Sequence, residues 1–490
     1  MDRKDRVAIA GWGVIAPKCR NVDEFEQRLE SSESWLEPFD GFGPDNFLVG
    51  RPSFDLADYR GWIEERFPPR RYAQIVEKLG MPIQYAIGAF IQALGQNRGV
   101  EQWLQELGTR ARVYVGTGIG DIETIRRCAL RLDAAQREWD AFWAGRGDDL
   151  TAYLDELREI ESRDVEGDVE TGKRSTIRRK RNLVARLQEK WGTPDPPWSE
   201  VPAELLWNIH NGPASQVSMI GRITGLSFAP VAACSTFGVA LELAMNAIRV
   251  GHADVVVVGA VDPPPNPLVV GAFYSARVIS ADATVSKPLT GLRGTHISGG
   301  AALWIVGRWE AMKERGFRPL GLEPVAVGVS SDADHVITPS VEGPLAAIRM
   351  ALGEAGVEGG EVGTWDLHAT ATPGDITEVE TLRRVLPEQV LVTARKGTFG
   401  HGMAVGGGWE LTAQHLGLAK GILHPTPLAA GELNSEIAKL HTRFVTDVRC
   451  GAGDFGPAAG GRAVAGKLSM GVGGVNACVV SRPWDPQEVG

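Results

Sequence analysis

The sequence predicts an α/β protein built from two related layered halves, with a charged helical segment inserted into the first half. Short apolar strands alternate with amphipathic helices along most of the chain, which is typical of sheets covered by helices. This alternation stops between about 122 and 205, where charged residues dominate, and it returns from 225. The 490 residues, of which 43% are hydrophobic, suffice to bury such a core without disulfides.

The first half begins with an expected strand over 6–16 (RVAIAGWGVIA) and an expected helix over 22–31, with Asn21 as its N-cap. Apolar residues at helical spacing predict a second helix over 72–97. The segment ARVYVG at 111–116 predicts the next strand. We assign the whole of 1–265 to this half and 266–490 to the second.

The inserted segment predicts a helical hairpin. Acidic residues dominate 148–170 and basic residues dominate 171–190, and leucines recur at helical spacing in both arms. One interpretation is a solvated hairpin whose arms face each other. The alternative is that Arg178–Arg181 dock an acidic carrier protein or a partner subunit.

After the insertion, strands and helices alternate again. ADVVVVGAVD (253–262) is almost uninterruptedly apolar, as expected of a strand covered on both faces. Further strands are expected near 303–306, 324–329 and 391–394, and helices near 343–355, 376–386 and 409–421.

Charge and cysteine usage narrow the class of protein. The net charge of −10 disfavours bulk binding of nucleic acid. The five cysteines form no CxxC pair, which argues against a disulfide framework and favours the reducing cytoplasm. The amino terminus predicts no signal peptide. No apolar run approaches the ~20 residues of a membrane span, so we expect no membrane partner.

Cys234 is the candidate nucleophile, because it lies where SFAPVAAC (227–234), an expected strand, meets a helix expected over 235–251. A thiol at a helix N-terminus lies near unpaired N–H groups that favour the thiolate. The same turn offers a backbone amide to an oxyanion. A small buried packing residue is the alternative interpretation of any isolated cysteine. We expect that packing role for Cys19, Cys128, Cys450 and Cys478.

His368 and His401 are candidate hydrogen-bond donors to a developing enolate or carbonyl oxygen. They lie in loops of small residues, WDLHATATPGD (365–375) and KGTFGHGMAVGGGWE (396–410). Either histidine alone is more often structural. One cysteine and two histidines also make three zinc ligands, but no short ligand spacing supports a metal site.

The tail KLSMGVGGVNACVV (467–480) predicts a glycine-rich turn between two apolar strands. It contains neither phosphate-binding glycine pattern, so we interpret it as a tight turn rather than a phosphate cradle.

Together these segments resemble the β-ketoacyl-acyl carrier protein synthases of the thiolase superfamily, over most of the chain except the insertion. VAACSTFGVALELAMNAIRVGHADVVVVGAVD (231–262) is similar to the nucleophile segment of that family. DLHATATPGD (366–375) is similar to its first histidine motif, and KGTFGH (396–401) matches its Lys-x4-His motif.

The resemblance implies a five-layered αβαβα fold, a homodimer or a ketosynthase-like heterodimer, and an acyl carrier protein as partner. It implies that the Cys234 thiolate takes an acyl group from a carrier-protein thioester. His368 and His401 would then bind the malonyl thioester, help it lose CO2 and stabilise the enolate, while Lys396 supports the histidines. Such a covalent thioester follows the general logic of nucleophilic catalysis.

The resemblance also implies contacts around the substrate. The amides of Cys234 and Met470 would form the oxyanion hole. No cofactor or metal is implied beyond the phosphopantetheine arm of the carrier protein. The other expected contacts are Thr370 and Thr372 with pantetheine, and Phe237 and Phe273 with the acyl chain.

One segment departs from the family pattern. KPLTGLRGTHISGGAALWIV (287–306) keeps Arg293 of an Asp-x-x-Arg-Asp-Gly-Phe run but lacks two acidic residues and a later Glu. Met470 and Val472 stand where the family has aromatic residues, and the loop after His368 is one residue shorter. The replacing residues in the altered segment are Thr290, Gly294, Thr295, His296 and Gly300.

The leading hypothesis is a β-ketoacyl synthase that condenses a Cys234-bound acyl group with malonyl-acyl carrier protein in a specialised fatty acid or polyketide pathway. One alternative is an acyltransferase that uses the same cysteine without decarboxylation. Another is a non-catalytic partner subunit of a ketosynthase heterodimer, against which the presence of Cys234 argues. The sequence leaves the acyl chain and the extender unit undetermined.

Overall fold

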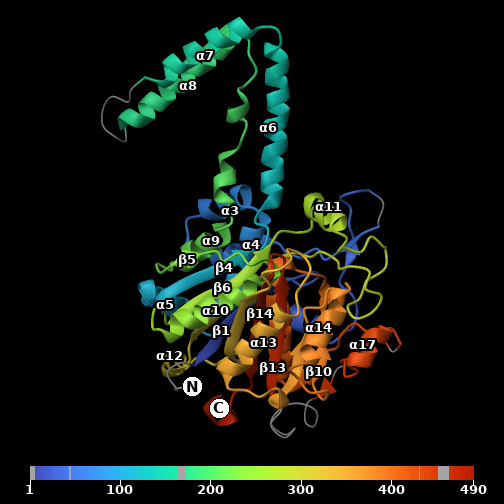
Figure 1. Ribbon diagram of the computed structural model, residues 1–490. Helices are drawn as coiled ribbons and strands as arrows, with labels where there is room; N and C mark the ends of the chain where they lie inside the picture. The colour runs from blue at the N-terminus through green and yellow to red at the C-terminus, as the bar shows by residue number, and fades with distance from the viewer. Residues whose placement is uncertain are drawn as a thin grey trace. The chain divides into compact units, whose positions relative to one another are not determined.

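The computed structural model describes residues 6–43, 46–163, 171–429, 431–447, 449–450 and 463–489 (Figure 1). The chain divides into two compact units. The first comprises Met1–Asp121 and Asn208–Gly490, and the second is the inserted segment Ile122–Trp207.

The first unit contains two five-stranded sheets. The order in the first sheet is β1 (Val7–Ile15), β7 (Gly300–Arg308), β6 (Val255–Asp262), β4 (Ala111–Thr117) and β5 (Ser227–Phe228). The order in the second is β8 (Glu323–Ser331), β14 (Val475–Arg482), β13 (Val464–Gly471), β9 (Val362–Asp366) and β10 (Leu391–Thr393).

The two sheets share one pairing pattern. Along each order, two antiparallel pairings are followed by two parallel pairings. This common pattern makes the two sheets related halves. β7 lies beyond residue 265, so the first sheet takes its second strand from the part of the sequence assigned to the second half.

Alternate side chains of β6 point to opposite faces of the first sheet, and each face packs against a different layer of helices. Val255 and Val257 lie in the same apolar cluster as α4 (Met81–Leu94) and α9 (Gly212–Gly221). Val256 and Val258 point to the opposite face, because successive side chains of a strand alternate.

The face with Val256 and Val258 packs on α10 (Thr236–Arg249) and α16 (Gly406–Ala419). The same cluster includes Val327 of β8 and Val479 of β14, so these helices lie between the two sheets. α13 (Glu342–Ala355) and α14 (Gly374–Arg383) cover the outer face of the second sheet (Figure 1). The result is the expected five-layered αβαβα fold, which confirms the predicted fold class.

Helix α1 (Val22–Leu29) begins as predicted, since Asn21 Oδ1 accepts a hydrogen bond from Glu24 N at 2.9 Å. None of the described helices is long and apolar enough to cross a membrane. The remaining elements of this unit are short. They include helices α2 (Arg60–Arg66), α5 (Val100–Glu106), α11 (Pro267–Ser275), α12 (Trp309–Glu314), α15 (Lys396–Phe399), α17 (Ser435–Leu440) and α18 (Pro486–Val489), and the strand pairs β2 (Glu37–Pro38) with β3 (Leu48–Val49) and β11 (Ile422–Leu423) with β12 (Arg449–Cys450).

Two sequence predictions are wrong in detail. The single helix expected over 72–97 is two helices, α3 (Arg70–Lys78) and α4, because Pro82 starts a new helix and cannot continue the old one. The strand expected over 227–234 ends at Phe228, so a loop separates it from Cys234. Pro230 lies in that loop and has no N–H for a ladder.

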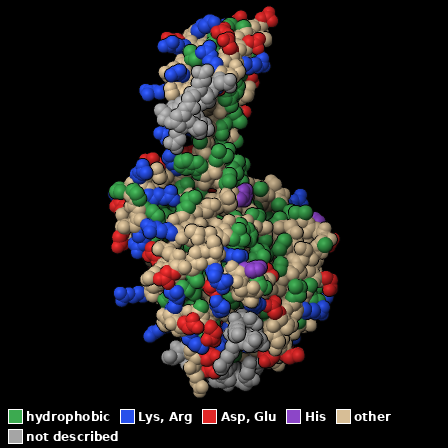
Figure 2. Space-filling view, turned by 90° about the vertical axis from the view of Figure 1, so that its left-hand side faces the viewer, with side chains coloured by type: hydrophobic (Ala, Val, Ile, Leu, Met, Phe, Trp, Pro, Cys, Tyr) green, Lys and Arg blue, Asp and Glu red, His purple; other side chains and the backbone are tan. Residues whose placement is uncertain are grey.

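The inserted unit contains three helices, one more than the predicted hairpin: α6 (Ile122–Trp143), α7 (Gly147–Glu161) and α8 (Thr171–Trp191). They share a small core of their own, formed by Trp139, Trp143, Tyr153, Ile160 and Leu187. Acidic and basic side chains are interspersed over its surface (Figure 2).

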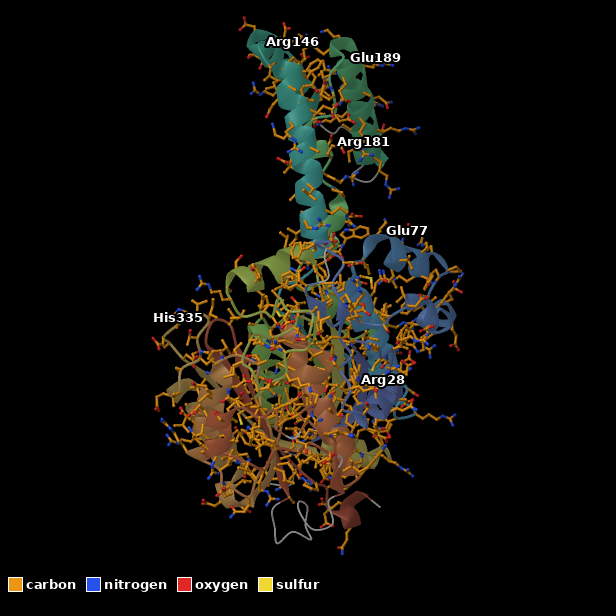
Figure 3. The ribbon with its side chains drawn as sticks, turned by 90° about the vertical axis from the view of Figure 1, so that its right-hand side faces the viewer. Arg28, Glu77, Arg146, Arg181, Glu189 and His335 are labelled. Atoms are coloured by element: carbon orange, nitrogen blue, oxygen red, sulfur yellow. The ribbon has the colours of Figure 1, made fainter. Side chains whose placement is uncertain are left out.

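The acidic and basic arms of the hairpin do face each other. Lys190 of α8 pairs with Glu156 of α7 at 2.7 Å, and Lys180 lies 3.9 Å from Glu161. Arg178, Arg179 and Arg181 are exposed, and Figure 3 labels Arg181 on the surface of α8. The solvated-hairpin interpretation therefore accounts for part of the charge, and the docking role of these arginines stays a prediction.

Candidate active site

Cys234 lies in a one-turn 3-10 segment directly before α10. The preceding Ala233 has a φ of 46°, a left-handed conformation that only tight surroundings hold in a residue with a side chain. Ser235 Oγ supplies such a restraint, because it donates to Ser469 O at 3.0 Å and to Val475 O at 2.7 Å. The turn that carries the thiol is thus tied to the β13–β14 hairpin.

The hairpin also approaches the thiol through its backbone. A Cβ at Gly471 would lie 2.7 Å from Ala232 O and 3.3 Å from Cys234 N, so a side chain there would collide with the turn. The backbone N–H groups that face the Cys234 thiol belong to Val472 and to Cys234 itself. The resemblance placed the oxyanion hole on the amides of Cys234 and Met470. Met470 lies within β13, whereas Val472 lies in the turn that follows, and the assignment of Met470 stays a prediction.

His401 follows the short helix α15 and reaches the thiol. Its Nε2 lies 3.1 Å from Cys234 Sγ, which is a hydrogen-bond distance for sulfur. Gly400 makes the turn possible, because its φ is 77° and a Cβ there would lie 2.1 Å from Ser298 Oγ.

His368 lies just after β9, in a loop whose backbone is held by buried carboxylates of α14. Its N–H donates to Glu378 Oε1 at 2.7 Å, and Thr370 N donates to Asp375 Oδ1 at 2.8 Å. The ring of His368 lies 5.3 Å from that of His401, centroid to centroid, in an edge-on arrangement. The structure therefore brings the three predicted groups, one thiol and two imidazoles, to one place.

Burial sets the protonation states at this place. It raises the pKa of the Cys234 thiol to about 11, although the Val472 N–H and the charge of Lys396 act in the opposite direction. Burial and then the nearby lysine charges hold the pKa values of His368 and His401 well below the ordinary value. The resting pair is a neutral thiol beside a neutral imidazole. Burial therefore acts against the ionised thiol expected from the helix N-terminus.

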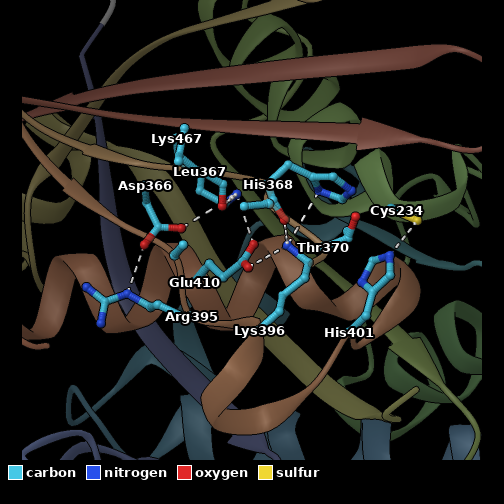
Figure 4. Close-up of polar contacts among 12 residues, drawn as sticks. Cys234, Asp366, Leu367, His368, Thr370, Arg395, Lys396, His401, Glu410 and Lys467 are labelled. Carbon is cyan, nitrogen blue, oxygen red and sulfur yellow. Dashed lines mark hydrogen bonds and ion pairs between the residues drawn. The ribbon is translucent and has the colours of Figure 1, made fainter. Parts of the chain in front are cut away.

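Lys396 enters a buried network of ion pairs behind the histidines (Figure 4). Its Nζ lies 2.7 Å from Glu410 Oε1 and 3.5 Å from His368 Nδ1, and it also donates to the carbonyl oxygen of His368. The second oxygen of Glu410 lies 2.9 Å from Lys467 Nζ. Lys396 therefore contacts the histidine as predicted, and it shares its counter-ion with a second lysine.

Asp366 and Arg395 complete the network. Asp366 pairs with Arg395 at 2.9 Å and lies 3.7 Å from Lys467 Nζ. The sequence analysis missed four members of the network: Asp366, Arg395, Glu410 and Lys467.

Two of these four carried a signal in the sequence. Lys467 is a lone charge in the apolar strand VAGKLSMG, and Glu410 is a lone charge in the apolar helix GGGWELTAQHLGLA. A charge in such a position is costly unless it is paired, so each indicated a hidden partner.

A cavity of about 100 Å³ opens at the thiol. Cys234, His368 and His401 line its inner part. Its wall also includes four residues that the sequence analysis predicted to lie near the substrate, and one that it did not. The four are Thr370, Thr372, Phe273 and Met470, and the fifth is Val472. The hydroxyls of Thr370 and Thr372 lie 3.0 Å apart.

Phe237 does not lie on this cavity. Its ring packs edge-on against Trp304, with 5.1 Å between centroids, in the core between the sheets. It lies three residues after Cys234 in α10, and this spacing turns its side chain toward the first sheet. The predicted place of Phe237 beside the acyl chain stays a prediction.

The altered segment 287–306 supports both histidine loops through its backbone. Gly294 N donates to Ala371 O at 2.8 Å, and His401 N donates to His296 O at 2.6 Å. Both nitrogens of the His296 ring contact backbone outside the segment: Nε2 accepts from Ser286 N at 2.7 Å, and Nδ1 lies 3.1 Å from Leu48 O. Backbone contacts do not depend on the missing acidic side chains, so the loops are held without them.

The arrangement of possible metal ligands does not favour a metal site. Among the described residues, no group of three or more His, Cys, Asp and Glu side chains is arranged to hold a metal ion. The sulfur and one imidazole are hydrogen-bonded to each other instead.

A buried thiol and two imidazoles between stacked α/β halves define a condensing enzyme of the thiolase superfamily. The family model for the N-terminal domain of β-ketoacyl synthases matches residues 199–312, and that for the C-terminal domain matches 323–429. The chain therefore belongs to the β-ketoacyl synthases, whose members are acyl-transferring condensing enzymes.

Individual relatives agree with this assignment. The chain is 26% identical over 435 residues to 3-oxoacyl-[acyl-carrier-protein] synthase 2 of Vibrio cholerae, which covers 86% of this chain and 88% of that protein. It is 30% identical over 218 residues to nodulation protein E of Rhizobium meliloti, covering 44% and 54% of the two chains.

Solved structures show the same fold. The ishigamide ketosynthase/chain length factor superposes with a TM-score of 0.73 at 20% identity, covering 98% of this chain and 99% of the other. A β-ketoacyl synthase from Burkholderia phymatum gives 0.72 at 18% identity, covering 98% and 100%.

Proposed function

We propose that the chain catalyses decarboxylative Claisen condensation between an acyl group on Cys234 and a malonyl group on an acyl carrier protein. The observation that carries this proposal is the 3.1 Å contact between Cys234 Sγ and His401 Nε2, with His368 beside it on the wall of one cavity. The functions of the relatives agree with it.

The first stage is acyl transfer to sulfur. The thiol is neutral at rest, so His401 Nε2 accepts its proton as the sulfur attacks the acyl thioester. The Cys–S–acyl bond forms, the carrier thiol leaves with the proton, and the Val472 N–H, which faces the sulfur, is placed to stabilise the tetrahedral oxyanion.

The second stage is carbon–carbon bond formation. The malonyl thioester carbonyl accepts hydrogen bonds from the neutral rings of His368 and His401. Once Cys234 is acylated, His401 Nε2 no longer accepts from the thiol, so the single proton of that ring moves to Nε2 and donates. Loss of CO2 leaves an enolate whose carbon attacks the Cys234 acyl carbon. The C–S bond breaks, the 3-oxoacyl group stays on the carrier, and the cysteine takes up one proton.

The remaining assignments follow from this reaction. The hydroxyls of Thr370 and Thr372 contact the pantetheine arm that the carrier protein supplies, and no other cofactor takes part. Half-buried Phe273, on the cavity wall, limits the acyl chain. The partners are an acyl carrier protein and a second ketosynthase-type subunit, either identical or different. The cytoplasm is the compartment that we assign.

The test exposes the protein to a panel of acyl-acyl carrier proteins and then to malonyl-acyl carrier protein. Intact mass should show one acyl group on the wild type, and CO2 and the 3-oxoacyl product should appear in equal amounts. Cys234→Ala should lose both results. Cys19→Ala is the matched control, because Cys19 is equally buried and does not line the cavity.

The outcomes separate the alternatives. An acyl-enzyme that forms product without CO2 would establish the non-decarboxylating acyltransferase. A wild type that takes up no acyl group from any carrier would establish a partner subunit and overturn the proposal.

A further inference from the structure

Lys467 is a buried cation in the middle of an apolar strand. It is 1% exposed, and its Nζ donates to Leu367 O at 3.2 Å and also to Leu468 O. Removing an ammonium group from water costs several kcal/mol, which only close anions and acceptors offset. Burial lowers the pKa of Lys467, but the carboxylates of Glu410 and Asp366 outweigh burial and raise it overall. The group therefore stays charged.

Glu410 connects this cation to the reacting histidine. One carboxylate oxygen lies 2.9 Å from Lys467 Nζ and the other lies 2.7 Å from Lys396 Nζ. Lys396 Nζ in turn lies 3.5 Å from His368 Nδ1 (Figure 4). An ammonium group has only protons to donate, so this contact makes Nδ1 the acceptor and leaves the N–H on Nε2.

The charges around His368 come from every element packed against it. They are Asp366 on β9, Asp375 and Glu378 on α14, Arg395 and Lys396 at the start of α15, His401 after α15, Glu410 on α16 and Lys467 on β13. Burial raises the pKa of Glu378 to about 7, and both of its oxygens accept backbone N–H groups. The ion pairs of the three cations go to two carboxyl groups, those of Asp366 and Glu410.

We propose that Lys467 is a positioning residue of the condensing site, which fixes the Glu410 carboxylate so that Lys396 holds His368 as the Nε2–H tautomer. The inference rests on the proposed condensation, in which His368 donates to the malonyl carbonyl. Lys467 touches neither the substrate nor the thiol. Its contacts reach His368 through Glu410 and Lys396, while its charge also helps to lower the pKa of His401.

The test compares Lys467→Met with Arg395→Met in the full-length protein. Both variants remove a buried cation that is 2% exposed or less and that lies near Asp366, but only Lys467 contacts Glu410. The readout is the pH dependence of kcat for malonyl-acyl carrier protein decarboxylation. A neighbouring cation disfavours imidazolium, so its removal raises the pKa of His368 and moves the acid limb to higher pH.

Lys467→Met should move the acid limb upward by about one pH unit and lower kcat by about tenfold. KM should stay within twofold of the wild type. Arg395→Met should move the limb less than Lys467→Met does, because Arg395 does not contact Glu410, and Lys467→Arg should restore the wild-type limb. Superimposed profiles for Lys467→Met and wild type, or equal shifts in both Met variants, would overturn the proposal.

A second readout separates this inference from the proposed function. Histidine ring 15N resonances, assigned with His368→Asn, report the tautomer and titration of His368 without any substrate. If the wild type releases no CO2, the condensation proposal fails, while the resonances still decide the role of Lys467. If His368 in Lys467→Met keeps the wild-type tautomer and titration, the proposed role of Lys467 is rejected.

Discussion

Replacing Glu410 with Gln leaves two buried ammonium groups without their shared anion. Both oxygens of Glu410 are used, at 2.7 Å from Lys396 and 2.9 Å from Lys467, and all three side chains are 2% exposed or less. Removing one partner of a buried pair typically costs about 3–5 kcal/mol, because the other charge stays desolvated. Glutamine has the same shape, so the loss of packing contributes little.

Glu323→Gln is the matched control. Glu323 also bridges two cations, Arg6 at 2.8 Å and Arg482 at 2.9 Å, and it is 1% exposed. Arg482, however, is 42% exposed and regains water when the carboxylate is removed. We expect this substitution to lower the free energy of unfolding by only about 1–2 kcal/mol.

Urea unfolding, followed by far-ultraviolet circular dichroism, gives the free energies of unfolding of Glu410→Gln and Glu323→Gln relative to the wild type. Adding Lys467→Met to Glu410→Gln removes one uncompensated cation, so the double variant should be more stable than Glu410→Gln by at least about 1 kcal/mol. The reasoning is refuted if Glu410→Gln and Glu323→Gln cost the same, or if the double variant is no more stable than the single one.

Three further predictions concern the thiol, a helix cap and the inserted unit. Burial raises the pKa of Cys234 to about 11, so its alkylation rate should rise about tenfold per pH unit between pH 7 and 10, and a plateau below pH 8 would contradict this. Asn21→Ala removes an N-cap hydrogen bond and should lower the unfolding free energy by about 1 kcal/mol, whereas unchanged urea unfolding would show that the cap contributes nothing. Changing Arg178, Arg179 and Arg181 together to Glu should leave carrier-protein affinity within twofold in titration calorimetry if the hairpin is only a solvated element, because these side chains are exposed, and a tenfold loss would establish docking.

The sequence by itself determined the elements that have a strong local signal. β6 is almost uninterruptedly valine, and Asn21 has the cap chemistry that starts α1, so both were predicted within a few residues. Cys234, His368 and His401 were predicted as a set because each stands in a small-residue loop that resembles a family motif. These features could be predicted because a local residue pattern and the order of motifs are contained in the sequence and need no knowledge of the fold.

Only the tertiary structure decided which groups face one another. Lys467 and Glu410 lie far apart along the chain, and no local pattern tells that β13 and α16 place them 2.9 Å apart. The same is true of Val472, whose N–H faces the thiol because the β13–β14 turn approaches the turn before α10.

The tertiary structure also decided the charge state of the thiol. A helix N-terminus favours the thiolate locally, whereas burial by distant segments raises the pKa of Cys234. Desolvation depends on what the whole fold packs around a group, so neighbouring residues in the sequence cannot fix it.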